Sequence, residues 1–295
     1  MMKFLFQRQS ELSRVIDPIA TDAIRDALSH VFYVTSWGYG ADHWFSWFVK
    51  ALNANPEIMA YLANEGSRPK YFPEERSRAQ RPDLIKFTRF MADVGMTYTA
   101  IGDCYSYRPT MMHAVLKEWT DVVRVVQLTR HPYAWLFFHV RWRATNMRML
   151  GGEQGPLEHE WRHGCDHELF KRLGLKPYKK EDIEIWTTYQ GMWKMNDVAS
   201  DTKMPIRQIP VEKIVASREL FCEVIDYLTH GRVKYDDRLL DMIYGWAWTP
   251  FRGEQSLRAL PKELRADWPD WKIEAFDKLV KSEAQDCFRE LGYEL

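Results

Sequence analysis

Short apolar runs rich in β-branched residues alternate along the chain with longer stretches of helical spacing. The strongest run, Val122–Thr129 (VVRVVQLT), is apolar almost throughout, as expected of a parallel strand buried on both faces. Weaker runs predict further strands at 31–36, 96–101 and 205–210. The spacing between the runs predicts helices at 17–29, 43–53, 84–94, 110–119, 133–150, 181–199, 211–228, 236–246 and 271–291.

Strands separated by long helices predict a parallel sheet with helices on both faces. The expected fold is therefore an α/β three-layer sandwich with a central parallel sheet. No repeat or Gly/Ser linker divides the chain, so we expect a single domain over 1–295. Residues 151–180, with Gly, Pro and many His, predict an irregular insertion, and 64–82 reads as a solvated loop.

Charge and composition narrow the class of protein. Lys+Arg and Asp+Glu both total 41 of 295 residues, which argues against a broad basic face for nucleic acid but permits a local basic pocket. The four cysteines form no CxxC pair and are expected to be reduced thiols. The first apolar run is too short for a signal peptide and no run could span a membrane, so we expect a cytoplasmic protein.

Three polar segments follow predicted strands, at Thr35–Asp42, Gly102–Arg108 and Arg130–Pro132. Ligands of parallel sheets bind at the carboxyl ends of the strands, so these segments are expected to meet there. Gly38 and Gly40 would let the first loop bring backbone N–H groups close to an anion at the start of the next helix. Glycine in a turn can equally serve conformation alone, and the absence of GK[ST] excludes a Walker A loop.

Four stretches in order resemble the sulfotransferases that use 3′-phosphoadenosine 5′-phosphosulfate (PAPS). A strand, loop and helix at Thr35–Trp44 stand where that family grips the 5′-phosphosulfate, and Leu128–Pro132 resembles its strand ending in Arg-x-Pro. Ile209–Ile214 resembles an acidic motif that follows a later strand. Phe251-Arg-Gly253 resembles a basic-Gly loop, and Leu291-Gly-Tyr293 a frequent ending of the family.

The resemblance implies a P-loop-like, nucleotide-binding transferase that moves a sulfuryl group from PAPS to a hydroxyl or amine acceptor. That acceptor would be a small molecule, a glycan or a lipid, and neither nucleic acid nor a metal is expected. The alternative is a catalytically impaired sulfotransferase-like protein that binds nucleotide or serves in an interaction. The residues implied in cofactor binding are Ser36, Trp37, Gly38, Tyr39, Gly40, Ala41, Asp42, His43, Trp44, Arg130, Arg252 and Gly253.

The chain departs from the family pattern at three places. Gly38 or Tyr39 stands where the family has a basic residue, and Asp42 replaces a threonine. Asp42 would either oppose an anion in the loop or cap the following helix. Phe138 stands where the family often has a serine that contacts the 3′-phosphate. Four basic residues are candidates to replace the missing loop cation: Lys50, Arg108, Arg141 and Arg252.

Two residues are candidates for the general base that sulfuryl transfer can use. Asp103 is expected just past the second strand, where it could also cap a turn, and His43 lies in the first loop, where it could also be structural. Tyr105, Tyr107 and Arg108 could contact the acceptor or the cofactor, or simply belong to the core.

A separate group of side chains, His159, His163, Cys165 and His167, lies in the irregular insertion. Imidazole and thiolate suit zinc, but the spacing matches no standard zinc finger. A metal-ordered loop, a lid over the acceptor and a solvated loop all remain open for this group.

Overall fold

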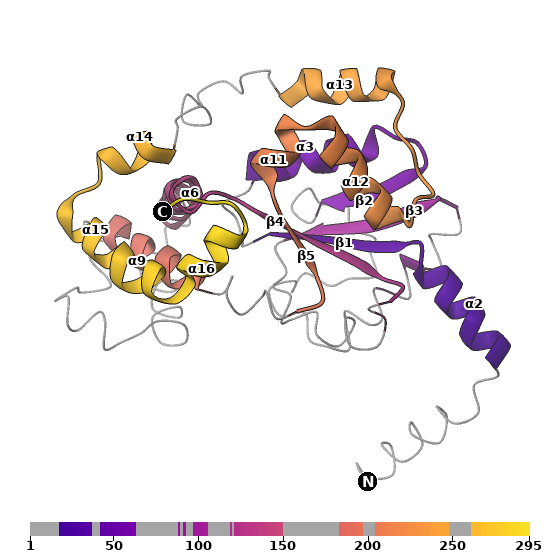
Figure 1. Cartoon of the computed structure of the whole chain (residues 1–295), viewed down its shortest axis with the longest axis horizontal. Helices are drawn as coiled ribbons and strands as arrows, with labels where there is room; N and C mark the ends of the chain where they lie inside the picture. Colours follow the sequence, from indigo (N-terminus) through magenta and orange to yellow (C-terminus); the bar gives the residue numbers. More distant parts are fainter. Residues whose placement is uncertain are drawn as a thin grey trace, which may run out of the picture.

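The centre of the molecule is a five-stranded parallel sheet in the order β2-β3-β1-β4-β5, seen in a computed structural model (Figure 1). The strands are β1 (Val31–Ser36), β2 (Ile58–Leu62), β3 (Ala100–Tyr105), β4 (Arg124–Thr129) and β5 (Arg207–Pro210). The structure describes residues 18–36, 42–62, 88, 91–92, 97–105, 119, 121–149, 183–196, 204–247 and 261–295.

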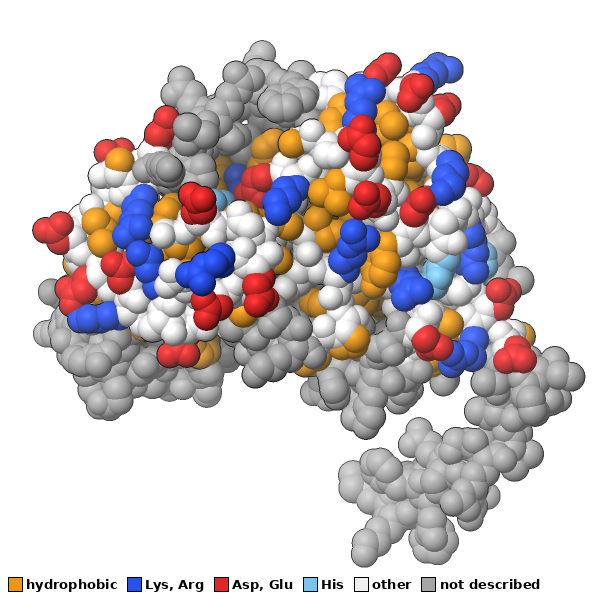
Figure 2. Space-filling view, viewed as in Figure 1, with side chains coloured by type: hydrophobic (Ala, Val, Ile, Leu, Met, Phe, Trp, Pro, Cys, Tyr) orange, Lys and Arg blue, Asp and Glu red, His pale blue; other side chains and the backbone are white. Residues whose placement is uncertain are grey.

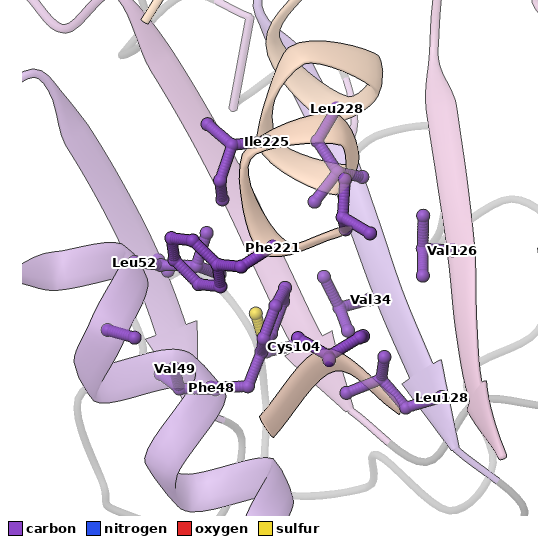
Figure 3. Packing of buried hydrophobic residues seen from close by; sticks show 14 of the residues in the cluster. Val34, Phe48, Val49, Leu52, Cys104, Val126, Leu128, Phe221, Ile225 and Leu228 are labelled. Atoms are coloured by element: carbon purple, nitrogen blue, oxygen red, sulfur yellow. The ribbon is translucent and has the colours of Figure 1, made fainter. Parts of the chain in front are cut away.

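Alternation along the strands gives the sheet two apolar faces. Phe32 and Val34 of β1, with Val126 and Leu128 of β4, point toward helices α3 (Asp42–Asn53) and α12 (Arg218–Thr229). Phe48, Leu52, Phe221 and Ile225 come down from those helices to meet them (Figure 3). We call this set the apolar cluster; α11 (Val211–Ala216) and α13 (Asp237–Ala247) also contribute to it.

The opposite face of the sheet carries the odd-numbered positions of β1. Val31 and Tyr33 pack there with Ile101 and Val125, and with Leu28 from the end of α2 (Pro18–Leu28). Met91, Ala92 and Trp119 cover the same face. The two covered faces confirm the predicted three-layer α/β arrangement.

A third group of helices packs beside the sheet and is joined to it through β4 (Figure 1). Helix α6 (Pro132–Met149) begins directly after β4 and packs on α9 (Ile183–Met195). Their shared core includes Trp135, Met192, Phe276 and Phe288. The other members of this group are α14 (Pro261–Ala266), α15 (Asp270–Phe276), the π-helical turn η6 (Asp277–Lys281) and α16 (Ser282–Glu290).

The second predicted strand was placed four residues too early. The sequence predicted a strand at 96–101 ended by Gly102, whereas β3 runs through Gly102 to Tyr105. Gly102 is needed for space: a Cβ there would lie 2.0 Å from Cε2 of Phe32 on the paired strand. A glycine inside a strand marks such a close approach as readily as it marks a turn.

Three further elements differ from the prediction. Strand β2 (Ile58–Leu62) was not predicted, and α14 was not predicted either. The helix expected over 211–228 is two helices, because Ser217 leaves helical geometry and its hydroxyl accepts a bond from the Leu220 N–H as the N-cap of α12. The predicted helices at 84–94 and 110–119, and the insertion at 151–180, lie wholly or largely outside the described residues.

Charged side chains of both signs are interspersed on the face of the molecule shown in Figure 2, in keeping with the neutral overall charge. Among the helices that the structure describes, none has the length and apolar character needed to cross a membrane.

Candidate functional site

The strands β1, β4 and β5 end at one edge of the sheet. Ser36, the last residue of β1, pairs with Leu128 of β4, and Thr129 pairs with Pro210 at the end of β5. The strand register therefore confirms the prediction that the loop after β1 and the Arg130 segment start from the same edge of the sheet. Helix α3 starts at this edge after the β1 loop, and α6 starts there after β4.

Arg130 directly follows β4 at this edge and is 3% exposed. Its guanidinium carbon is 4.1 Å from the centroid of the Phe138 ring, one and a half turns into α6. A guanidinium over an aromatic ring gains a cation–π attraction, and its donors have the planar, forked geometry of arginine. Those in-plane donors are the ones that bind phosphate or sulfate oxygens in a forked geometry.

The first N–H groups of α6 are already used within the protein. Pro132, the first residue of the helix, has no N–H. The His131 N–H donates to Glu212 Oε1 at 2.8 Å, and the Tyr133 N–H donates to His131 Nδ1 at 3.3 Å. The N–H groups of His131 and Tyr133 therefore already have acceptors within the protein.

The ring of His131 is held in its neutral form. Nδ1 accepts the Tyr133 N–H, while Nε2 donates to the Glu294 carbonyl oxygen at 3.1 Å, which is the pattern of a singly protonated imidazole. Burial lowers the pKa of His131 to about 4, against the opposing effect of the Glu294 bond. At neutral pH the ring thus adds no positive charge to the edge.

Glu212 and Tyr293 complete a hydrogen-bonded chain around Arg130. The Thr129 hydroxyl lies 3.2 Å from the Tyr293 hydroxyl, which itself donates to Glu212 Oε2 at 3.1 Å. Burial raises the pKa of Tyr293 well above its usual value, and the nearby Glu212 charge acts in the same direction, so the phenol keeps its proton. We call Thr129, Arg130, His131, Glu212 and Tyr293 the β4 junction.

The segment 291–295 is turned back onto the sheet by Gly292. This residue has a φ of 86°, and the Tyr293 N–H bonds to the Phe288 carbonyl at 2.8 Å, which ends α16 in a Schellman-type turn. Lys213 Nζ donates to the Leu291 carbonyl at 3.1 Å and ties the turn to α11. Tyr293 consequently reaches the β4 junction, where it is 7% exposed.

The loop after β1 is described only at its two ends. Ser36 is buried at the end of β1, and Trp44 packs half-buried against the apolar cluster. Asp42 and His43 are the first residues of α3, but the structure does not describe their side chains, nor residues 37–41. The predicted roles of Trp37, Gly38, Tyr39, Gly40, Ala41, Asp42 and His43 stay predictions, as do those of Arg252 and Gly253.

Asp103 does not follow a strand as predicted but lies inside β3. Its side chain is fully buried, and its backbone pairs with Tyr33 on β1 and Tyr61 on β2. By alternation it belongs to the face of the sheet that carries Tyr33, whose hydroxyl lies 2.6 Å from that of Thr88. A cap on a following turn is thus excluded for Asp103.

Polar side chains continue across this same face, which the sequence did not predict. Thr35 pairs with Gln127 of β4, and Gln127 pairs with Gln208 of β5. Gln208 Nε2 donates to Gln127 Oε1 at 2.7 Å, and Thr35 and Gln127 are fully buried. Near its carboxyl end the sheet is therefore polar on one face and apolar on the other.

Two of the four candidates to replace the loop cation lie well along their helices, away from the ends of β1 and β4. Lys50 is exposed in the last turn of α3, about 12 Å along the helix from its start. Arg141 is exposed about 13 Å along α6 from its first residue. Arg108 and Arg252 lie outside the described residues, as do Tyr107, His159, His163, Cys165 and His167, and the side chain of Tyr105.

The part of the chain that the structure describes contains no group of three or more His, Cys, Asp or Glu side chains that could hold a metal ion. No protein-family model matches the sequence, and a search of curated proteins finds no match.

Among solved structures, a sulfotransferase from Alicyclobacillus acidocaldarius is similar to this chain. The match has 10% sequence identity and a TM-score of 0.38, and it covers 90% of this chain and 96% of that one. At this TM-score the similarity by itself indicates no function.

Proposed function

We propose that this protein is a sulfotransferase that moves the sulfuryl group of PAPS to a hydroxyl or amine. The observation that carries the proposal is the position of Arg130: a buried guanidinium at the carboxyl end of β4, beside the end of β1. In the family that the sequence resembles, the corresponding arginine binds the 3′-phosphate. A parallel sheet binds its ligands at this edge.

Each half of the donor has a place in this proposal. The 3′-phosphate is bound by the in-plane N–H groups of Arg130, behind which the Phe138 ring closes the site. The 5′-phosphosulfate is bound by the loop between β1 and α3, whose glycines allow close approach of the backbone. Arg252 and Gly253 add to donor binding, as the basic-Gly loop of the family implies.

The acceptor is deprotonated by His43 at the start of α3 or by Asp103 on β3. His43 is placed by the same turn that binds the sulfuryl group, which favours in-line attack. Asp103 would act from the polar face of the sheet. The acceptor is a small molecule, a glycan or a lipid, no metal takes part, and the protein works in the cytoplasm.

The desulfated product, adenosine 3′,5′-bisphosphate, provides the test. Because a ligand at 100 times its dissociation constant stabilises the native state by about 2.7 kcal/mol, thermal denaturation should shift upward with this nucleotide. Adenosine alone, which lacks both phosphates, is the control and should leave the transition in place. An unchanged transition at millimolar adenosine 3′,5′-bisphosphate would contradict the proposal.

A further inference from the structure

We infer that Glu212 and Tyr293 are positioning residues for Arg130, holding its guanidinium where the 3′-phosphate of the donor binds. This inference rests on the function proposed above. It assigns a role to two residues that would not touch the substrate, and it makes the turn at Gly292 part of the phosphate site.

The residues directly before and after Arg130 are both held by the pair Glu212 and Tyr293. Before it, the Thr129 hydroxyl bonds with the Tyr293 hydroxyl at 3.2 Å. After it, the His131 N–H donates to Glu212 at 2.8 Å. The Tyr293 hydroxyl then donates to the second oxygen of Glu212 at 3.1 Å, so the two contacts form one connected chain.

Both members of the pair are themselves fixed by the fold. Glu212 stands in the first turn of α11, two residues after Pro210, the last residue of β5. Tyr293 follows the positive-φ residue Gly292, and its ring packs on His131 at 5.4 Å between centroids. The pair therefore joins the residues on either side of Arg130 to segments 81 and 164 residues away in sequence.

The bonding pattern argues against direct substrate contact by either residue. Each oxygen of Glu212 already accepts one hydrogen bond from the protein, and a carboxylate would repel a phosphate. Tyr293 is 7% exposed, and its hydroxyl proton is directed to Glu212. What the pair can do is limit the motion of Arg130, and a small displacement of a positioning group can cost far more than its own contacts.

A comparison of two ligands separates positioning from general stability. Adenosine 3′,5′-bisphosphate carries the 3′-phosphate, and adenosine 5′-monophosphate lacks it. Isothermal titration of the wild type should show tighter binding of the bisphosphate. Tyr293→Phe keeps the ring but removes the hydroxyl, and we expect it to reduce that preference about tenfold, which corresponds to about 1.4 kcal/mol. Glu212→Gln should reduce it similarly.

Two further sets of variants control for the loss of a hydroxyl group in itself and for a failure of Tyr293→Phe to fold. Tyr235→Phe removes another phenol hydroxyl, one that donates to the carbonyls of Ala51 and Leu52 at the far end of α3, and it should leave the preference unchanged. Thr129→Val reaches the same hydrogen-bonded chain without altering Tyr293, and Thr129→Ser should restore the wild-type preference. The threonine pair decides the question if Tyr293→Phe fails to fold.

The outcomes distinguish this inference from the proposed function. If the wild type binds neither nucleotide, the proposed function fails. If Arg130→Lys loses the preference while Tyr293→Phe and Thr129→Val both keep it, the nucleotide site stands and the positioning role is refuted. A loss of affinity for both ligands by the same factor would also refute the role, because it would show a general loss of structure.

Discussion

The apolar cluster and the β4 junction attach helices to the same sheet by different forces. In the cluster, Phe48 and Phe221 pack with the even-numbered side chains of β1 and β4 in one apolar core (Figure 3). At the junction, the strand is joined to α11 and to the segment after α16 by hydrogen bonds among Thr129, His131, Glu212 and Tyr293.

Because of this difference, we expect the apolar cluster to determine mainly stability and the β4 junction mainly nucleotide binding. Apolar packing contributes free energy of folding in proportion to the area buried, and it does not depend on the direction of the contact. A network of polar groups contributes less net free energy but fixes atoms in place, because each donor must meet its acceptor. We therefore expect changes in the cluster to lower stability and to leave nucleotide affinity nearly intact. Changes at the junction should mainly lower nucleotide affinity, with a smaller loss of stability than changes in the cluster.

The largest effect on stability is expected from Phe221→Ala in the cluster. Phe221 is fully buried, and its ring lies 5.9 Å from that of Phe48 and 5.1 Å from that of Tyr235. Loss of this ring should lower the free energy of unfolding by about 3–5 kcal/mol. Urea denaturation measures the loss, and Phe221→Leu should recover part of it.

Nucleotide affinity of the folded Phe221→Ala variant tests whether the apolar cluster and the β4 junction act independently. Adenosine 3′,5′-bisphosphate should bind folded Phe221→Ala with nearly the wild-type dissociation constant. A large drop in affinity would show that the cluster and the junction are coupled, and the division between them would then be wrong.

A smaller effect is expected from protonation of His131 at the junction. The folded protein lowers the pKa of this group from 6.5 to about 4, so it favours the neutral ring. The resulting stability is present above about pH 6.5 and is lost as the pH falls toward 4, by at most about 3.4 kcal/mol. Urea denaturation at a series of pH values should show this loss in the wild type.

His131→Asn is the matched variant for this pH series. Its side-chain oxygen can accept the Tyr133 N–H in place of Nδ1 but does not titrate. The difference in unfolding free energy between wild type and variant should shrink as the pH falls. A difference independent of pH would mean that His131 is not held neutral by the fold.

Much of the fold could be predicted because hydrophobic periodicity reports burial directly. The strands at 31–36 and 122–129 and the helices around 43–53 and 236–246 were found in this way. Gly102 misled the prediction because the sequence does not show that the Phe32 ring would lie over it. Strand β2 has only five residues, too few for a clear alternating pattern.

The sequence motifs of the candidate site could be predicted, but the hydrogen bonds between them could not. Arg130, the Ile209–Ile214 tract and the Leu291–Tyr293 segment were each recognised as motifs. Glu212 bonds to His131, directly after Arg130, and also to Tyr293. Each of these contacts joins residues that are 81 apart in sequence. No local pattern records such contacts. Asp103 was misplaced for a related reason, since an acidic residue after glycine suggests a turn when β3 in fact continues.

The most direct test of the account is a calorimetric titration of adenosine 3′,5′-bisphosphate into the wild type and Arg130→Lys. Lysine keeps the charge but lacks the planar fork and the stacking on Phe138. We expect measurable binding by the wild type and a loss of affinity of about 30- to 100-fold in the variant, or about 2–3 kcal/mol. Equal affinity of the two proteins would contradict the assignment of Arg130 to the 3′-phosphate.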